Sequence, residues 1–180
     1  CLATKEWHKM GYEQLVVSVN VTNYQLKRDG YIQSVKNLLA EIEFDPKRLE
    51  LEITESTIME DVEKMLVKLN ELKNMGISIS IDDFGTGYSS LSYLKRLPVQ
   101  TLKIDQSFVR NLQPGSTALS LCKAIIVMAH ELGMRVVAEG VETEMQRDLL
   151  LHAGCDHGQG FLFARPMSVA DFDVWMDQNT

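Results

Sequence analysis

Apolar and polar residues alternate along six short segments of the chain. Every second side chain of a β-strand lies on the same face, so this alternation predicts strands. The segments are Leu15–Val21, Leu49–Glu55, Gly76–Asp83, Thr101–Asp105, Arg135–Glu139 and Asp156–Phe161. The predicted strands are spread along the whole chain.

Between most of these segments, apolar residues recur every three or four positions, which is the spacing of one helix face. Helices are therefore predicted at Asp61–Met75, Thr117–Leu132 and Glu144–Ala153. Gly133 and Gly154 directly follow the last two, and glycine commonly ends a helix. Strands that alternate with helices indicate βα units and a largely parallel sheet.

The predicted strands have one apolar and one polar face, with Glu50 and Glu52, or Ser78 and Ser80, on the polar face. In a doubly wound open sheet both faces are covered by helices, so its strands read as nearly continuous apolar runs. A polar second face instead fits a barrel whose interior leads to a site at the carboxyl ends of the strands. We expect an α/β, TIM-barrel-like fold with about six βα units in this chain, fewer than the usual eight.

Composition narrows the class of protein. The 180 residues are 45% hydrophobic and 24% charged, which fits one globular domain and excludes wholesale disorder. The net charge of −7 argues against a basic surface that grips a DNA or RNA duplex, although metal ions can join an acidic pocket to a small nucleotide. Cys1, Cys122 and Cys155 are too few for a disulfide framework and favour a reducing compartment.

Polar and acidic side chains stand where the predicted strands end. In a parallel barrel these ends surround one mouth. The residues are Asn20, Glu52, Asp82, Asp83, Lys103, Asp105, Glu139 and Gln159. So many carboxylates would repel one another unless several are protonated or cations lie between them. An oxygen-rich set without Cys or His suits Mg²⁺ or Mn²⁺ better than zinc.

This arrangement suggests a reaction. The adjacent carboxylates Asp82 and Asp83 could share a pair of ions, which is the geometry used for in-line displacement at a phosphodiester. Lys103 would then orient or activate the attacking water, and Glu139 would accept a proton. The simpler interpretation is that each acid is a solvated loop residue or an ion-pair partner.

The most specific local motif is Asp-Asp-Phe-Gly-Thr-Gly-Tyr-Ser-Ser, at residues 82–90. Its glycines permit backbone conformations that other residues avoid, which indicates a mobile loop beside the site. A weaker motif, His152, Cys155 and His157, has the form H-x₂-C-x-H that can bind zinc, but no fourth ligand is evident.

Taken together, these motifs resemble the EAL-domain family. The matching segments are Leu51–Glu55, Asp82–Ser90, Leu102–Asp105, Ala138–Thr143 and Gly158–Gly160. The resemblance extends from about Trp7 to Met167, with the motifs in the family's order. It implies a phosphodiesterase that opens the bacterial second messenger cyclic di-GMP to linear 5′-pGpG, by in-line attack of a water activated by a pair of Mg²⁺ or Mn²⁺ ions.

The resemblance also implies a role for each candidate residue. The implied metal ligands are Asn20, Glu52, Asp82 and Asp83. The implied catalytic residues are Lys103, Glu139 and Gln159, and the implied substrate-side residues are Asp105 and Glu142. The loop that couples dimer contacts to metal binding is anchored by Glu55 and includes Phe84, Gly85, Thr86 and Gly87.

The Glu-Ala-Leu sequence that gives the family its name does not occur in this chain. In the family it lies on an early strand, and its glutamate is a metal ligand. We therefore interpret residues 1–180 as the C-terminal portion of an EAL phosphodiesterase domain without the N-terminal part of the barrel. Alone, these residues are expected to be weakly active or inactive.

The resemblance further implies a homodimer and upstream sensory or GGDEF-type domains. It implies a cytoplasmic location for the domain. In some family members, the whole protein is tethered to the inner membrane. An alternative function is that of an inactive cyclic di-GMP receptor that signals through its dimer interface. Such receptors usually have eroded ligand motifs, whereas the set in this chain is intact.

Overall fold

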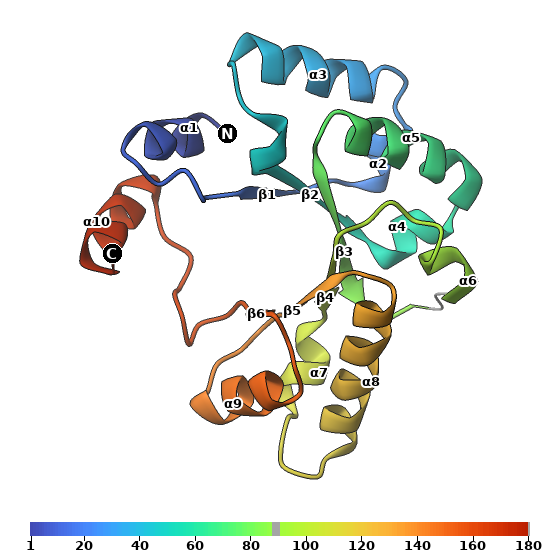
Figure 1. The fold of residues 1–180 in the computed structure, drawn as a ribbon, viewed down its shortest axis with the longest axis vertical. Coiled ribbons are helices and arrows are strands. Elements are labelled where there is room, and N and C mark those ends of the chain that lie inside the picture. Colours follow the sequence, from blue (N-terminus) through green and yellow to red (C-terminus); the bar gives the residue numbers. More distant parts are fainter. Residues whose placement is uncertain (88–90, 180) are drawn as a thin grey trace.

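The computed structural model describes residues 1–87 and 91–179. Within these ranges, six parallel strands form one sheet in which the strands follow one another in chain order (Figure 1). The strands are β1 Val17–Asn20, β2 Leu49–Thr54, β3 Ser78–Phe84, β4 Thr101–Ile104, β5 Arg135–Ala138 and β6 His157–Gly158. Helices connect successive strands, so the predicted α/β class is confirmed.

The sheet curves into half of a barrel, with β1 and β6 as its two edges in the described part of the chain (Figure 1). Helices lie around the outside of this sheet. They are α1 Leu2–Lys9, α2 Asn23–Lys27, α3 Tyr31–Glu41, α4 Glu55–Met59, α5 Val62–Asn74, α6 Leu91–Leu94, α7 Gln106–Arg110, α8 Thr117–Glu131, α9 Glu144–His152 and α10 Val169–Asn179, with a 3₁₀ turn η1 at Pro46–Arg48. None of the described helices is long and apolar enough to cross a membrane.

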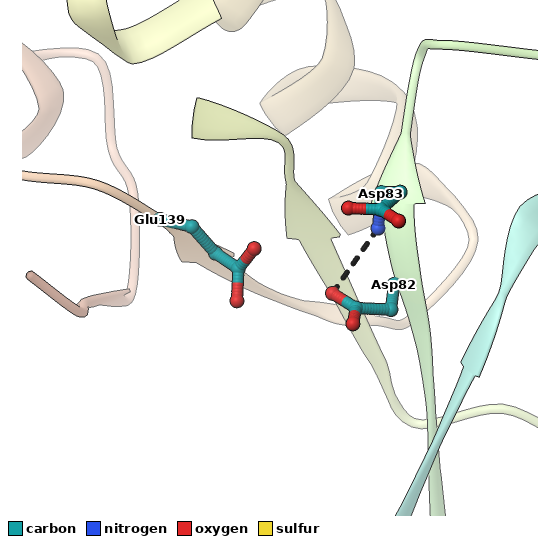
Figure 2. A group of neighbouring side chains, drawn as sticks. All are labelled: Asp82, Asp83 and Glu139. Carbon is teal, nitrogen blue, oxygen red and sulfur yellow. Dashed lines mark hydrogen bonds between the residues drawn. The ribbon is translucent and has the colours of Figure 1, made fainter. Parts of the chain in front are cut away.

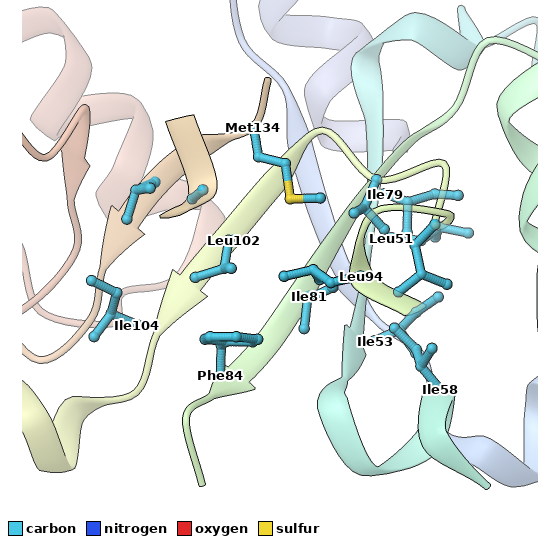
Figure 3. Close-up of a cluster of buried hydrophobic side chains, with 14 of the residues drawn as sticks. Leu51, Ile53, Ile58, Ile79, Ile81, Phe84, Leu94, Leu102, Ile104 and Met134 are labelled. Atoms are coloured by element: carbon cyan, nitrogen blue, oxygen red, sulfur yellow. The ribbon is translucent and has the colours of Figure 1, made fainter. Parts of the chain in front are cut away.

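The core lies between the apolar face of the sheet and the helices. Figure 3 shows the central strands contributing isoleucine and leucine side chains to it, among them Ile53, Ile81 and Leu102, each exposed by 1% or less. Leu69 of α5 and Ile126 of α8 close this layer from outside. Burying one such side chain contributes about 1.5–3 kcal/mol, so this layer holds the strands, and hence their ends, in place.

Alternation predicted the strands correctly but extended several of them too far. Glu55 begins α4, and Asp105 is the N-cap of α7, where its carboxylate accepts a hydrogen bond from the Ser107 amide at 3.0 Å. Glu139 follows β5. At each of these residues the chain leaves the strand and enters a loop or a helix. An acidic side chain is common at the start of a helix, so its presence does not show that the strand continues.

The edge strands are shorter than predicted. β1 begins at Val17 rather than Leu15, and β6 comprises His157–Gly158 rather than the whole of 156–161. Each edge strand is hydrogen-bonded to one neighbouring strand among the described residues. It is therefore regular only where that one neighbour pairs with it. The predicted helices are confirmed as α5, α8 and α9. Most of their ends differ from the prediction by one residue.

The first and last helices contact each other. Trp7 Nε1 of α1 donates a hydrogen bond to Asp173 Oδ1 of α10 at 2.5 Å, and the Trp7 and Phe172 rings lie 4.7 Å apart. Figure 1 shows the two helices side by side. This contact joins the two ends of the described chain.

Candidate metal centre

A bulge in β3 brings two neighbouring aspartates to the same side of the sheet. Ile81 pairs with Leu102 and Phe84 with Ile104, so Asp82 and Asp83 together oppose a single residue of β4. In a regular strand, adjacent side chains point to opposite faces. The left-handed backbone of Asp83, with φ of 54°, breaks that alternation. Figure 2 shows both carboxylates at the end of β3.

Lys103 of β4 lies at the centre of the site. Its Nζ contacts Glu139 Oε1 at 2.6 Å, Glu52 Oε2 at 2.8 Å and Asp82 Oδ1 at 3.2 Å, and its side chain is 4% exposed. Burial favours the neutral amine, but the hydrogen bonds to Glu139 and Glu52 outweigh it and raise the pKa of Lys103. Lys103 is therefore a fixed positive charge that can orient oxygen atoms but cannot accept a proton.

The acids outnumber this lysine. Burial raises the pKa of Glu139, against the opposing effect of its hydrogen bond to Lys103. Burial also raises the pKa of Asp83, and the charges of Asp82 and Asp105 raise it further. Both raised pKa values mean that the protein itself does not fully neutralise the negative charge of Glu139 and Asp83.

The donor set fits a hard divalent cation. Asp82, Asp83 and Glu139 each offer a carboxylate oxygen, and these atoms lie within 4.8 Å of one another (Figure 2). Carboxylate oxygens without sulfur or imidazole suit Mg²⁺ or Mn²⁺. The excess of carboxylates over lysine would be relieved by such ions, because a cation between them favours their charged forms.

Two other predicted ligands stand beside this group. Glu52, 8% exposed, is joined to Asp82 and Glu139 through Lys103. Asn20 ends β1 and pairs in register with Glu52, so it lies on the neighbouring strand at the same level. The structure thus places the predicted ligands on three successive strands, with Glu139 reaching them from the end of β5.

A cavity of about 230 Å³ opens next to the carboxylates. It is lined by the predicted residues Glu139, Glu142 and Gln159, and also by Gln106 and Phe161. The sequence analysis did not single out Gln106 or Phe161. Both follow a predicted site residue closely, Asp105 and Gln159 respectively, but neither a lone amide nor a lone aromatic ring indicates a site by its type.

Glu55 holds the start of the glycine loop. Its carboxylate, 2% exposed, accepts hydrogen bonds from the amides of Gly85 at 2.9 Å and Gly87 at 3.4 Å. A Cβ at Gly87 would lie 2.7 Å from Glu55 Oε1, so this approach requires glycine. Phe84 is buried in the core, whereas Thr86 is exposed. Residues 88–90 of the predicted loop lie outside the described residues, and its coupling to a dimer remains a prediction.

The zinc hypothesis finds no support in the geometry. His152 Nδ1 lies 2.7 Å from the Asp148 carbonyl of its own helix, and Cys155 Sγ donates to the His157 carbonyl at 3.2 Å. Among the described residues, the group of His, Cys, Asp and Glu side chains close enough to share an ion is the acidic one.

A parallel β/α half-barrel with an acidic, lysine-centred site at its carboxyl strand ends defines the class of TIM-barrel-type metal-site domains. Within that class the chain belongs to the EAL domain family, which it matches over residues 1–166. The resemblance of the sequence motifs is confirmed.

Two curated relatives are similar over almost the whole chain. The signalling protein YkoW of Bacillus subtilis is 43% identical over 176 residues, which cover 98% of this chain and 22% of YkoW. MucR of Pseudomonas aeruginosa, named a bifunctional diguanylate cyclase/cyclic di-GMP phosphodiesterase, is 45% identical over 167 residues, which cover 93% of this chain and 24% of MucR. The chain thus spans less than a quarter of the length of these relatives.

Solved structures confirm the fold. The MucR phosphodiesterase in complex with c-di-GMP superimposes with a TM-score of 0.92 at 44% identity, covering 96% of this chain and 70% of that chain. BlrP1 of Klebsiella pneumoniae, in a complex with manganese and cyclic di-GMP, has a TM-score of 0.81 at 28% identity, covering 92% of this chain and 42% of that chain. The half-barrel is therefore part of the EAL TIM-barrel fold.

Proposed function

We propose that this chain belongs to an enzyme that hydrolyses cyclic di-GMP to linear 5′-pGpG. Membership of the EAL family and the name of MucR as a cyclic di-GMP phosphodiesterase support this substrate. The observation that carries the proposal is the intact group of Asp82, Asp83 and Glu139 around the charged Lys103. Every implied ligand in this span has a side chain able to bind a cation.

Asp82, Asp83, Asn20 and Glu52, with Glu139, would hold a pair of Mg²⁺ or Mn²⁺ ions. The manganese complex of BlrP1 supports this type of cofactor. When bound, such ions neutralise phosphate oxygens and make water a better nucleophile at neutral pH. This is the chemistry that the acidic set needs and that Lys103 cannot supply alone.

The chain's own residues would orient and deprotonate the attacking water. Glu139, whose pKa is raised chiefly by burial, is suited to take the proton as the water oxygen bonds to phosphorus. Lys103 keeps its charge and stabilises negative charge that develops on the phosphate oxygens. The bond to the ribose oxygen breaks on the opposite side, and that oxygen takes a proton from solvent. Gln159, which lines the adjacent cavity, would support the attacking water. Glu142, which lines the same cavity, and Asp105, the N-cap of α7, would bind the substrate.

We further propose that residues 1–180 form the C-terminal portion of the EAL domain. Two observations support this: β1 and β6 are unpaired on one side in the described chain, and the match covers 70% of the MucR phosphodiesterase chain. A homodimer, a cytoplasmic location and an upstream cyclase-type domain complete the proposal. The name of MucR pairs a diguanylate cyclase with a phosphodiesterase, which supports the last of these.

The test is an Asp82→Ala variant of the full-length protein, assayed by chromatography of pGpG with Mg²⁺ or Mn²⁺. Removing a carboxylate that would hold the ions should lower turnover at least about 100-fold. Asp29→Ala, at an exposed aspartate, is the control and should retain activity. Near-normal pGpG release by Asp82→Ala would refute the assignment. Tight cyclic di-GMP binding by the unmodified protein without any product would favour the receptor function instead.

A further inference from the structure

Gln146 is a buried amide that makes more hydrogen bonds than its helix requires. It is 7% exposed and occupies the third position of α9. Its Oε1 accepts from the Thr143 amide at 3.0 Å, while Thr143 Oγ1 accepts from the Gln146 amide at 3.3 Å. These two bonds form an ordinary capping box, which satisfies free amides at the start of a helix.

Two further bonds of Gln146 leave this box. Oε1 also accepts from the amide of Glu142 at 2.8 Å, and Nε2 donates to the Val109 carbonyl of α7 at 3.1 Å. Both partners are main-chain groups, so they fix backbone positions rather than single side chains. Gln146 thereby connects the segment that precedes α9 to a helix 37 residues away in the chain.

The same segment touches α7 at its other end. Gly140 packs so closely on Gln106 that an added Cβ would lie 2.6 Å from Gln106 Cβ. The N-cap of α7 is Asp105, whose charge contributes to the raised pKa of Asp83. Residues 139–143 and α7 are therefore held together at two points, one next to the acidic group and one at Gln146.

The cavity beside the acidic group lies between these two elements. Gln106 lines it from α7, and Glu139, Gly140 and Glu142 line it from the segment after β5. With a volume of about 230 Å³, it would change markedly in width if either element moved by an ångström. The bond from Gln146 to Val109 opposes such a movement.

A second capping box in the chain shows what a cap alone needs. On α2, Gln25 and Thr22 make the same reciprocal bonds. Gln25 is exposed, and its hydrogen bonds in the described chain stay within that turn. Burial of an amide is unfavourable unless its groups are hydrogen-bonded, so the burial of Gln146 depends on the bonds that lead to Glu142 and Val109.

We propose that Gln146 is a positioning residue: it sets the distance between α7 and the Glu139–Glu142 segment, and so the width of the cavity that receives the substrate. The inference rests on the proposed function of this site. Gln146 touches no reacting atom and acts through the backbone of Glu142 and Val109. A change in its link to α7 should therefore alter substrate affinity more than turnover.

Gln146→Glu separates the two roles in the full-length protein. Glutamate preserves the capping box and the bond from Glu142, but it replaces the Nε2 donor with an oxygen that faces the Val109 carbonyl. We expect KM for cyclic di-GMP to rise about tenfold, with kcat within about threefold of the unmodified enzyme. Gln25→Glu makes the same change of charge in the matched box, and both constants should stay within about twofold.

Gln146→Ala removes the cap as well as the link. Hydrogen exchange of the Glu142 and Thr143 amides, measured without substrate, should accelerate at least about tenfold in this variant and remain slow in Gln146→Glu. KM should rise at least as much as in Gln146→Glu, which keeps the proposal testable if the buried glutamate prevents folding. Melting temperatures of all three variants identify any loss of folded protein.

An equal KM in Gln146→Glu and Gln25→Glu would overturn the proposal, because the link to Val109 would then have no effect on the cavity. A fall in kcat with unchanged KM would overturn it too. If the unmodified protein released no pGpG, the proposed function would fail. The dissociation constant for cyclic di-GMP, from calorimetry on the same variants, would then decide the role of Gln146 by itself.

Discussion

At the scale of single residues, Asp83 shows how backbone and charge combine to form the site. Its left-handed φ of 54° is uncommon outside glycine, although aspartate adopts it more readily than most residues. The motif of two aspartates predicted the candidate ligands from sequence. The sequence analysis placed both at the mouth because the predicted strand ends there. It did not predict the bulge that turns both carboxylates to one side, because strict alternation assigns neighbours to opposite faces and no particular residue type marks a bulge.

Asp83→Asn should stabilise the protein in the absence of divalent ions. The folded pKa of Asp83 is raised, chiefly by burial and then by Asp82, so the folded state binds its proton more tightly than the unfolded state. Stability is therefore lost as pH rises from the ordinary pKa of aspartate through the raised value, and at pH 7 the ionised group is unfavourable. Asparagine removes the charge and tolerates the left-handed backbone.

Thermal unfolding with and without Mg²⁺ measures this effect. The metal-free melting temperature of Asp83→Asn should rise by about 2–4 °C, and the gain in melting temperature on adding Mg²⁺ should shrink. Asp29→Asn, which changes an exposed aspartate by the same atoms, should alter neither value. A lower metal-free melting temperature in Asp83→Asn would contradict the account of a strained, under-neutralised acid.

At the scale of elements, long periodic segments were predictable and short connecting ones were not. α5 and α8 are long enough for their apolar spacing to show. α7 has five residues, too few for a period, and its start depends on the cap that Asp105 provides. The bond from Gln146 to α7 was equally hidden, because its partner is a main-chain carbonyl, which every residue possesses.

Asp156 joins three elements and should make their packing sensitive to acid. Its Oδ2 accepts from the Val136 amide of β5 at 2.7 Å and is hydrogen-bonded to His130 Nε2 of α8 at 2.9 Å, directly before β6. Burial opposes ionisation, but the bonds to His130 and Val136 outweigh it and lower the pKa of Asp156. The carboxylate therefore contributes stability above the ordinary aspartate pKa, and this is lost as pH falls through the lowered value.

Asp156→Asn should accordingly be less stable at pH 7 by about 0.5–1 kcal/mol, a small value because the side chain is one-third exposed. The difference from the unmodified protein should shrink as pH falls through the lowered pKa of Asp156 and vanish below it, where both side chains are neutral. Urea unfolding at several pH values measures it. Asp148→Asn, at an exposed ion pair with Arg147, is the control. A difference that persists unchanged in acid would show that charge is not involved.

At the scale of the whole molecule, the site depends on a barrel to which the described chain contributes six strands. Counting strands predicted this, since six βα units leave a TIM-type barrel open. The order in which the strands pair, their lengths and which strands form the edges could be established only from the structure. The candidate ligands Asn20 and Glu139 lie on or beside strands towards opposite ends of the sheet, so a shift of either edge would separate them.

The 180 residues expressed alone should therefore be poorly active. β1 and β6 each expose unpaired amides and carbonyls, and Val19 on β1 is 41% exposed, so these edges invite pairing between molecules. We expect concentration-dependent oligomers in light scattering, and pGpG release at least about 100-fold slower than from the full-length protein. A matched sample of the full-length protein carrying Asp82→Ala defines the background of the assay. A monomeric, fully active 180-residue chain would show that the half-barrel holds its ligands without further strands, and would contradict the proposed division of the domain.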